Sequence, residues 1–163
     1  LFRSPGLFIH IGGDECPKAR WKKCNKCQLL MKSQNLKDEM ALQSYFVNKI
    51  SDYIRNKGKN VIGWDEIMEG GLAPHAFVMS WRGEEGGIEA ANMDHDVVMT
   101  PGKPLYFDYS QSANEDSLTI GGLNTIADVY DYDPVPKSLS PEKTKHIIGA
   151  QANMWTEIGR AHV

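Results

Sequence analysis

Five short apolar runs, separated by stretches with helical periodicity, constrain the fold of this chain more than any other feature. The runs occupy residues 7–11, 60–64, 76–81, 96–100 and 146–151. Strands that alternate with helices are typical of βα units, in which each helix returns the chain so that successive strands run parallel. The sequence therefore predicts an α/β fold with a parallel sheet of five strands.

The clearest helix is predicted over residues 38–57. One row of apolar side chains repeats there every four residues, namely Leu42, Phe46, Ile50 and Ile54, and this spacing indicates one face of a helix. Gly58 follows where a left-handed residue commonly ends a helix.

Other helices are expected to be shorter. One contains the cysteines that follow the first strand, and an alanine-rich one covers residues 86–93. Residues 131–141 contain three prolines and read as an extended surface loop. Ser140 is a candidate N-cap for a short helix that begins at Pro141.

Length and charge limit the classes of partner. The 163 residues give room for about one domain. Eighteen basic and 21 acidic residues give a net charge of −3, which leaves no basic excess for a nucleic-acid backbone. No run of about 18 apolar residues exists, so no membrane span is expected. Residues 1–6 have neither a starting Met nor the pattern of a signal peptide, and we expect the chain to be a piece of a longer protein.

Three cysteines, Cys16, Cys24 and Cys27, leave alternatives open. An odd number cannot form internal disulfides alone. The spacing offers three ligands for zinc, whereas a structural zinc site normally has four, and the nearest histidine, His10, belongs to another motif. Alternatively, Cys24 and Cys27 lie one helical turn apart and pack as small buried hydrophobes. An exposed pair would be sensitive to oxidation instead.

Acidic and aromatic side chains follow every predicted strand. In chain order they are Asp14 and Glu15; Trp64, Asp65 and Glu66; Trp81 and Arg82; Tyr106 and Asp108; and Trp155 and Glu157. The carboxyl ends of parallel strands share one face, and active sites of α/β proteins are built there. We therefore expect these side chains to form one site.

The residue types at these positions favour a sugar as the ligand. An indole packs on the apolar C–H face of a sugar ring, and carboxylates accept hydrogen bonds from its hydroxyls. A phosphate would require basic residues, and Gly12-Gly13 followed by two acids would repel it. A hard cation bound by the acids is a weaker alternative, because the members of each Asp-Glu pair are adjacent and their side chains diverge. Tryptophans that serve only as core are the other alternative.

Five segments of the chain resemble family 20 glycoside hydrolases, the β-N-acetylhexosaminidases. The segments are residues 10–15 (HIGGDE), 63–66 (GWDE), 80–83 (SWRG), 105–108 (LYFD) and 149–157 (GAQANMWTE). The first is quite specific by itself, and five segments in the right order make a chance match improbable. The resemblance covers nearly the whole chain.

The resemblance implies a partial (β/α)8 TIM barrel, in which residues 1–163 form the C-terminal part of the catalytic domain and carry strands four to eight. It also implies a retaining mechanism in which the 2-acetamido oxygen of the substrate is the nucleophile. Glu15 then corresponds to the general acid and base, and Asp14 to the residue that holds the acetamido N–H. Tyr106 corresponds to the donor to the acetamido oxygen.

The same resemblance assigns the remaining contacts with the sugar. Three tryptophans, Trp64, Trp81 and Trp155, would wall the pocket, and two acids, Asp108 and Glu157, would hold hydroxyls. His10 would position the catalytic loop through a buried hydrogen bond or, alternatively, shuttle protons. Asp65 and Glu66 stay ambiguous between a supporting role and an outer subsite.

The resemblance implies no cofactor and no metal, and a glycan with a terminal N-acetylhexosamine as the partner. Three of the eight strands and a sugar-gripping Arg are absent from the chain, so closure of the barrel needs a missing half or self-association. A carbohydrate-binding or assembly fragment without turnover is therefore the alternative function. The family acts on extracellular, periplasmic or lysosomal glycans, and the chain itself carries no localisation signal.

Overall fold

The computed structural model of the chain describes residues 5–114, 119 and 121–155. The chain forms two compact units, Leu1–Val78 and Met79–Val163. Within each unit the strands follow chain order. The boundary between the units falls within β3, so the first unit contains β1, β2 and the start of β3, and the second contains the end of β3, β4 and β5.

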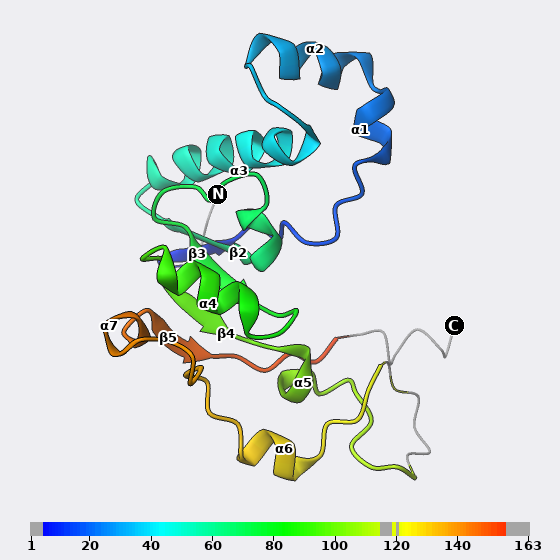
Figure 1. The fold of residues 1–163 in the computed structure, drawn as a ribbon, viewed down its shortest axis with the longest axis vertical. Coiled ribbons are helices and arrows are strands. Elements are labelled where there is room, and N and C mark those ends of the chain that lie inside the picture. The colour runs from blue at the N-terminus through cyan, green and yellow to red at the C-terminus, as the bar shows by residue number, and fades with distance from the viewer. Residues whose placement is uncertain (1–4, 115–118, 120, 156–163) are drawn as a thin grey trace. The chain divides into compact units, whose positions relative to one another are not determined.

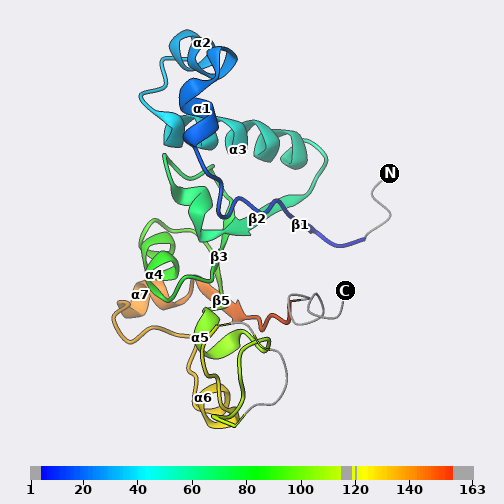
Figure 2. The same ribbon diagram turned by 90° about the vertical axis from the view of Figure 1, so that its right-hand side faces the viewer.

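The first unit is built on the parallel pair of β1 and β2. Its elements are β1 (Phe8–His10), α1 (Ala19–Lys23), α2 (Asn25–Ser33), α3 (Glu39–Arg55), β2 (Asn60–Trp64), the 3-10 turn η1 (Asp65–Met68) and the start of β3 (Phe77–Ser80). Ile9 is opposite Val61 in the register. Helix α3 packs on β2 and η1 (Figure 1), and α2 packs on α3, with α1 beside α2 (Figure 2).

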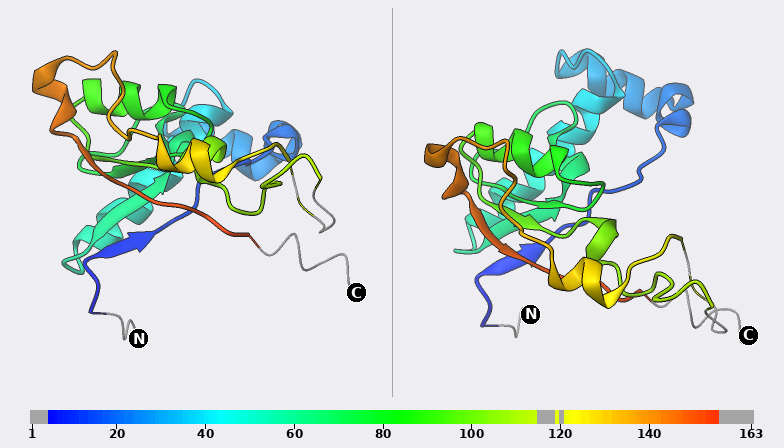
Figure 3. Two further views of the ribbon diagram at one scale, coloured as in Figure 1. Left: turned by 90° about the horizontal axis from the view of Figure 1, so that it is seen from below. Right: turned by 60° about the horizontal axis from the view of Figure 1, so that its bottom comes forward.

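The second unit is built on the parallel pair of β4 and β5. Its elements are the end of β3, α4 (Glu85–Asn92), β4 (Val97–Met99), the irregular turn α5 (Gly102–Leu105), α6 (Ile126–Tyr130), α7 (Pro141–Thr144) and β5 (Ile147–Ala150). Strands β4 and β5 lie side by side (Figure 3), with a register shift after Val97. Helix α4 packs on β4, and Val97, Met99 and Ala90 are fully buried.

The predicted α/β class and all five predicted strands are confirmed. β2 has the predicted bounds, and each of the other four strands begins and ends one residue inside its predicted run. Gly58 adopts the left-handed conformation after α3, with φ of 71°, and its N–H donates to the Arg55 carbonyl. Residues 131–140 contain no helix or strand, as the prolines indicate.

The apolar face predicted for α3 is partly wrong. Leu42 and Ile54 are buried, but Phe46 is 62% exposed. A row with a spacing of four residues drifts around a helix with 3.6 residues per turn. The buried side therefore passes through Val47 and Ser51 instead, and Phe46 faces outward.

The interpretation of the cysteines as buried helical residues is also wrong. Cys24 lies between α1 and α2 in extended conformation, and both Cys24 and Cys27 are free and only half-buried. In the part of the chain that the structure describes, no three His, Cys, Asp or Glu side chains group as a metal site would require. Among the same residues, no helix is both long and apolar enough to cross a membrane.

Three elements, η1, α5 and α6, were not predicted from the sequence, and one helix was expected where the structure has α1 and α2. Helix α6 begins with a capping box, in which Thr125 Oγ1 accepts from the backbone N–H of Asp128 and the Asp128 carboxylate accepts from the backbone N–H of Thr125. The pattern Thr-x-x-Asp is a recognised helix start. This short helix was missed because the neighbouring glycines and prolines indicate a loop.

Removal of the N-cap of α3 should destabilise the first unit. Asp38 Oδ1 accepts from the Ala41 N–H at 2.8 Å. We expect Asp38→Ala to lower the free energy of unfolding by about 1 kcal/mol, because that N–H loses its partner. Chemical denaturation of the protein that carries this chain measures the change. The exposed mid-helix Asp52→Ala is the matched control, and an equal loss there would contradict the prediction.

Candidate active site

The loop after β1 carries the two acids expected to be catalytic. Gly12 and Gly13 have φ of 68° and 100°, and Glu15 has φ of 44°. The Gly12 carbonyl accepts from the Trp64 N–H at 3.0 Å, which continues the pairing with β2 past the end of β1. Asp14 and Glu15 project beyond this pairing and are exposed.

Close packing against Ile67 fixes the same loop. A Cβ on Gly13 would overlap the Cγ2 atom of Ile67, and a Cβ on Gly63 would lie 2.8 Å from that atom. Ile67 is fully buried in η1. Only glycine permits this approach, so the backbone of the loop rests directly on an apolar side chain.

A buried amide ties the loop to α3. Gln43 is 4% exposed, and its Nε2 donates to the carbonyls of Gly13, at 3.3 Å, and Glu66, at 3.2 Å. The backbone that precedes Asp14 is therefore anchored from the helix and from η1. The sequence reasoning missed both Gln43 and Ile67, because a polar residue in a helix and an isoleucine in a turn carry no signal of this role.

His10 contacts the loop from the end of β1. Its Nδ1 accepts from the Gly12 N–H at 3.1 Å, and its ring meets Trp64 edge-on, with centroids 4.9 Å apart. Loss of hydration lowers the pKa of His10, and the Asp14 carboxylate opposes that shift. The expected hydrogen bond from His10 to the loop is present, but the expected burial of His10 is not. β1 is the first strand of the sheet order, so His10 stays partly exposed.

The residues that follow β2 are buried. Trp64, Asp65 and Glu66 are 8%, 1% and 6% exposed, respectively. Both carboxylates therefore pack in the interior of the first unit, directly after β2. Trp64 still contacts His10, so it lies beside the loop that carries the two acids.

In the second unit, an aromatic cluster surrounds Tyr106. Its ring centroid lies 6.3 Å from Trp81, in a stacked arrangement, 6.3 Å from Trp155 and 5.8 Å from Tyr109. Tyr106 is buried, whereas Trp155 is 40% exposed. Three aromatic residues far apart in the sequence thus hold the phenol in one place.

Backbone pairing and one buried amide position Tyr106. It forms a parallel bridge with Asn153, in which the Phe107 N–H donates to the Asn153 carbonyl at 2.7 Å. Asn124 Nδ2 donates at 2.8 Å to the carbonyls of Gly102 and Tyr106. Asn124 and Tyr109 were not predicted to take part. Asp108, two residues further on, is 2% exposed.

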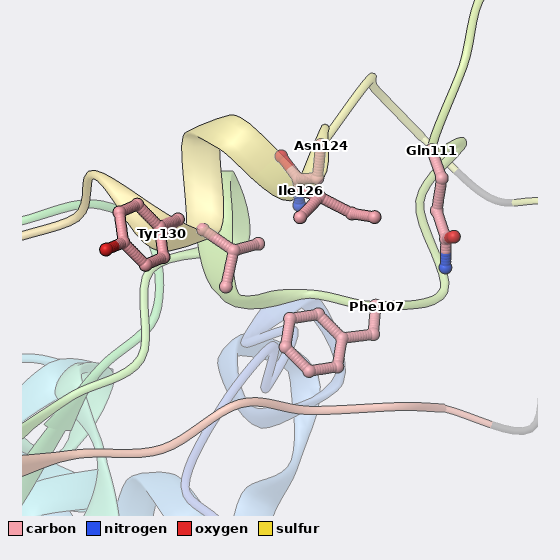
Figure 4. Close-up of a pocket in the computed structure, with 6 residues that line it drawn as sticks. Phe107, Gln111, Asn124, Ile126 and Tyr130 are labelled. Atoms are coloured by element: carbon pink, nitrogen blue, oxygen red, sulfur yellow. The ribbon is translucent and has the colours of Figure 1, made fainter.

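An apolar hollow of about 310 Å³ lies beside this segment. It is lined by residues that follow Tyr106 and by α6 (Figure 4), namely Phe107, Gln111, Asn124, Ile126, Val129 and Tyr130. Ile126 and Tyr130 are 80% and 87% exposed. Asn124 lines this hollow and also donates to the carbonyl of Tyr106. The hollow therefore lies next to the backbone of Tyr106.

The described residues therefore give two groups of site residues. In the first unit, His10, Asp14, Glu15 and Trp64 lie in or against one loop. In the second unit, Trp81 and Trp155 surround Tyr106. Glu157 lies outside the described residues. The first group contains two exposed carboxylates, and the second contains aromatic side chains around a buried phenol.

Comparison with known proteins identifies the family. The family model for the catalytic domain of glycosyl hydrolase family 20 matches residues 1–163. A β-hexosaminidase of Porphyromonas gingivalis is 55% identical over 155 residues, which cover 94% of this chain and 20% of that protein. One of Vibrio furnissii is 29% identical, with 94% and 26% covered. The chain thus spans about a fifth to a quarter of these relatives.

Solved structures agree with the fold. The GH20 exo-β-N-acetylglucosaminidase of Vibrio harveyi, in complex with N-acetylglucosamine, superposes with a TM-score of 0.83 at 30% identity, over 94% of this chain and 25% of that one. The chitobiase of Flavobacterium johnsoniae gives 0.74 at 33% identity, with 94% and 22% covered. The predicted partial TIM barrel is therefore confirmed.

A side chain at Gly13 should disturb the loop. Gly13→Ala combines a strained positive φ with overlap on Ile67, and we expect it to cost about 2–4 kcal/mol of unfolding free energy. Gly58→Ala is the matched control, because its φ is also positive but no atom lies within 4 Å, so it should cost only about 1 kcal/mol. Chemical denaturation measures both, and equal costs would disprove the packing role of Ile67.

The lowered pKa of His10 predicts a pH dependence. Between its folded pKa and the ordinary value of 6.5, the unfolded state binds a proton that the folded state does not, so stability falls as the pH falls through this window. His10→Asn keeps an acceptor for the Gly12 N–H but cannot titrate. We expect this variant to gain stability relative to wild type between about pH 7.5 and pH 5.5. Denaturation of wild type and variant at each pH measures the difference in their free energies of unfolding. A difference that stays constant across this pH range would refute the prediction.

Proposed function

Because the chain belongs to glycosyl hydrolase family 20, we propose that the protein carrying it hydrolyses terminal, non-reducing β-linked N-acetylhexosamine residues. The observation that carries the proposal is the Asp14–Glu15 pair, exposed on a loop that packing on Ile67 and the Gln43 amide hold in place. The names of the relatives, β-hexosaminidase and exo-β-N-acetylglucosaminidase, support the same substrate class.

The proposed mechanism is retaining and substrate-assisted. The 2-acetamido oxygen attacks the anomeric carbon while Glu15 protonates the leaving oxygen, and Glu15 then activates the water that opens the cyclic intermediate. Because the nucleophile belongs to the substrate, the protein supplies orientation and proton transfer. The exposure of Glu15 on an anchored loop suits an acid that must reach a substrate oxygen.

Asp14 and Tyr106 are proposed to aim the acetamido group. Asp14 would accept from its N–H and stabilise the positive charge that develops on the intermediate, and Tyr106 would donate to its oxygen. The contacts of Tyr106 with Trp81, Trp155 and Tyr109 support this role, since a buried and immobilised phenol loses little entropy when it binds.

The sugar contacts stay a proposal as well. Trp64, Trp81 and Trp155 would provide apolar surface for the ring face and the acetamido methyl, and Asp108 and Glu157 would accept from hydroxyls. Trp155 is 40% exposed, so part of its indole is accessible to a ligand. The reaction requires no cofactor or metal in this scheme.

We further propose that residues 1–163 supply strands four to eight of the barrel, and that the remaining strands come from the rest of a longer protein or from another chain. The alternative, a carbohydrate-binding fragment without turnover, is not favoured. A module that only bound sugar would not need Asp14 and Glu15 exposed together with a fixed Tyr106.

Substitution of the proposed acid should discriminate between leaving groups. Glu15→Gln in the protein that carries this chain should reduce kcat/KM for alkyl or disaccharide substrates by about 10²–10⁴. The loss should be much smaller for dinitrophenyl glycosides, because their leaving group needs little protonation. Steady-state kinetics on both classes measures the two losses.

Two variants complete this test. Asp14→Asn should reduce turnover on both classes alike, since it acts on the nucleophile and not on the leaving group. The exposed Glu89→Gln, on α4, is the matched isosteric control and should leave turnover unchanged. Equal losses on both classes for Glu15→Gln would show that Glu15 is not the acid.

A further inference from the structure

Cys24 and Cys27 lie where the two short helices of the first unit meet. Cys24 is the single residue between α1 and α2, with extended backbone angles of φ −88° and ψ 112°. Its N–H donates to the Trp21 carbonyl at 3.2 Å, and its carbonyl accepts from the Gln28 N–H at 3.0 Å. Backbone hydrogen bonds on both sides therefore hold the position of Cys24.

The fold places the two thiols at the start of one helix. Cys24 is the N-cap of α2 and Cys27 is the third residue of that helix, the spacing at which an N-cap side chain lies over the first turn. A disulfide accepts Cα separations of about 4.4–6.8 Å, which suits two residues at this spacing. Both are free and half-buried, so a small reagent has access to the sulfur atoms.

The surroundings make the two thiols unequal. The backbone N–H of Cys27 and then its thiol lower the pKa of Cys24, although the sulfur makes no capping hydrogen bond of the usual geometry. The pKa of Cys27 is raised, chiefly by its hydrogen bond to Cys24. Cys24 is thus favoured as the attacking thiolate, and Cys27 stays protonated until the second step. Thiol–disulfide exchange requires one thiolate that attacks first and a second thiol that resolves the mixed disulfide.

A zinc site and a purely structural role fit this pair less well. In the described part of the chain, no third His, Cys, Asp or Glu joins the two sulfurs in a group suited to a metal. Both cysteines are more exposed than core residues of the same unit such as Met31, which is 8% exposed. Two half-buried free thiols, one at the N-cap of α2 and one in its first turn, instead meet the requirements for oxidation.

We propose that Cys24 and Cys27 form a reversible redox pair, which closes to a disulfide by exchange with a small disulfide compound. The Cys24 thiolate attacks one sulfur of the compound and displaces its first thiolate, which gives a mixed disulfide. Cys27 then loses its proton to water, and its thiolate attacks the Cys24 sulfur and displaces the second thiolate. The protein loses two electrons and two protons, and the compound is reduced to two thiols.

The disulfide would close at the junction of three helices. Gln28 follows Cys27, and its Nε2 donates to the Trp21 carbonyl of α1 at 3.0 Å and to Glu39 Oε1 of α3 at 3.2 Å. The bond would therefore join the first turn of α2 to the residue that links α1 to it. This inference is independent of the proposed hydrolase activity.

Peptide mapping of the protein that carries this chain tests the inference. The protein is treated with glutathione disulfide, quenched in acid and cut with trypsin. Lys26 lies between the two cysteines, so trypsin separates residues 24–26 from 27–32, and only a disulfide keeps the two peptides together. We expect the linked pair, about 2 Da lighter than its two reduced peptides combined, and its loss after treatment with dithiothreitol.

Three variants complete the test. Cys27→Ser should stop at the mixed disulfide on Cys24, with a gain of about 305 Da. Cys24→Ser should slow modification of Cys27 at least about tenfold, because the better nucleophile is gone. Cys16→Ser should form the linked pair as in wild type. A link that includes Cys16, zinc bound in stoichiometric amount through these thiols, or the absence of the linked pair would overturn the proposal.

Discussion

The contact between the Gly12-Gly13 loop and Ile67 is the constraint on which the proposed catalytic pair depends. Gly13 and, in β2, Gly63 let the backbone approach this fully buried side chain closely, and Gln43 fixes the carbonyl of Gly13 from α3. Asp14 and Glu15 themselves are exposed. Their placement therefore comes from apolar packing one and two residues earlier in the chain.

In the second unit, long-range contacts hold Tyr106 in a similar way. Tyr106 forms a bridge with Asn153, and its ring contacts Trp81, Tyr109 and Trp155. Asn124 fixes its backbone carbonyl. In both units a buried side-chain amide therefore donates to a backbone carbonyl at or directly before a proposed site residue.

The secondary structure could be predicted where the signal is local. The strands were found because apolar runs of five or six residues between turns are a clear signal, and α3 was found through its length and Gly58. The face of α3 was misjudged at Phe46, because a row of side chains spaced by four residues drifts around a helix with 3.6 residues per turn. The capping box at Thr125 was overlooked because prolines and glycines lie nearby in the sequence. The exposure of Cys24 and Cys27 depends on how α2 packs against α3, which is not a local signal.

The sequence by itself determined the α/β class, the order of the strands and the residue types at their carboxyl ends, because each is written in short segments of the chain. It also carried the five motifs that indicate the family. Only the tertiary structure decided which residues hold the functional ones. Ile67 beneath Gly13, Gln43 beneath the catalytic loop and Asn124 behind Tyr106 act from 18 to 54 positions away. Contacts over such distances in the sequence arise from packing, and no local pattern encodes them.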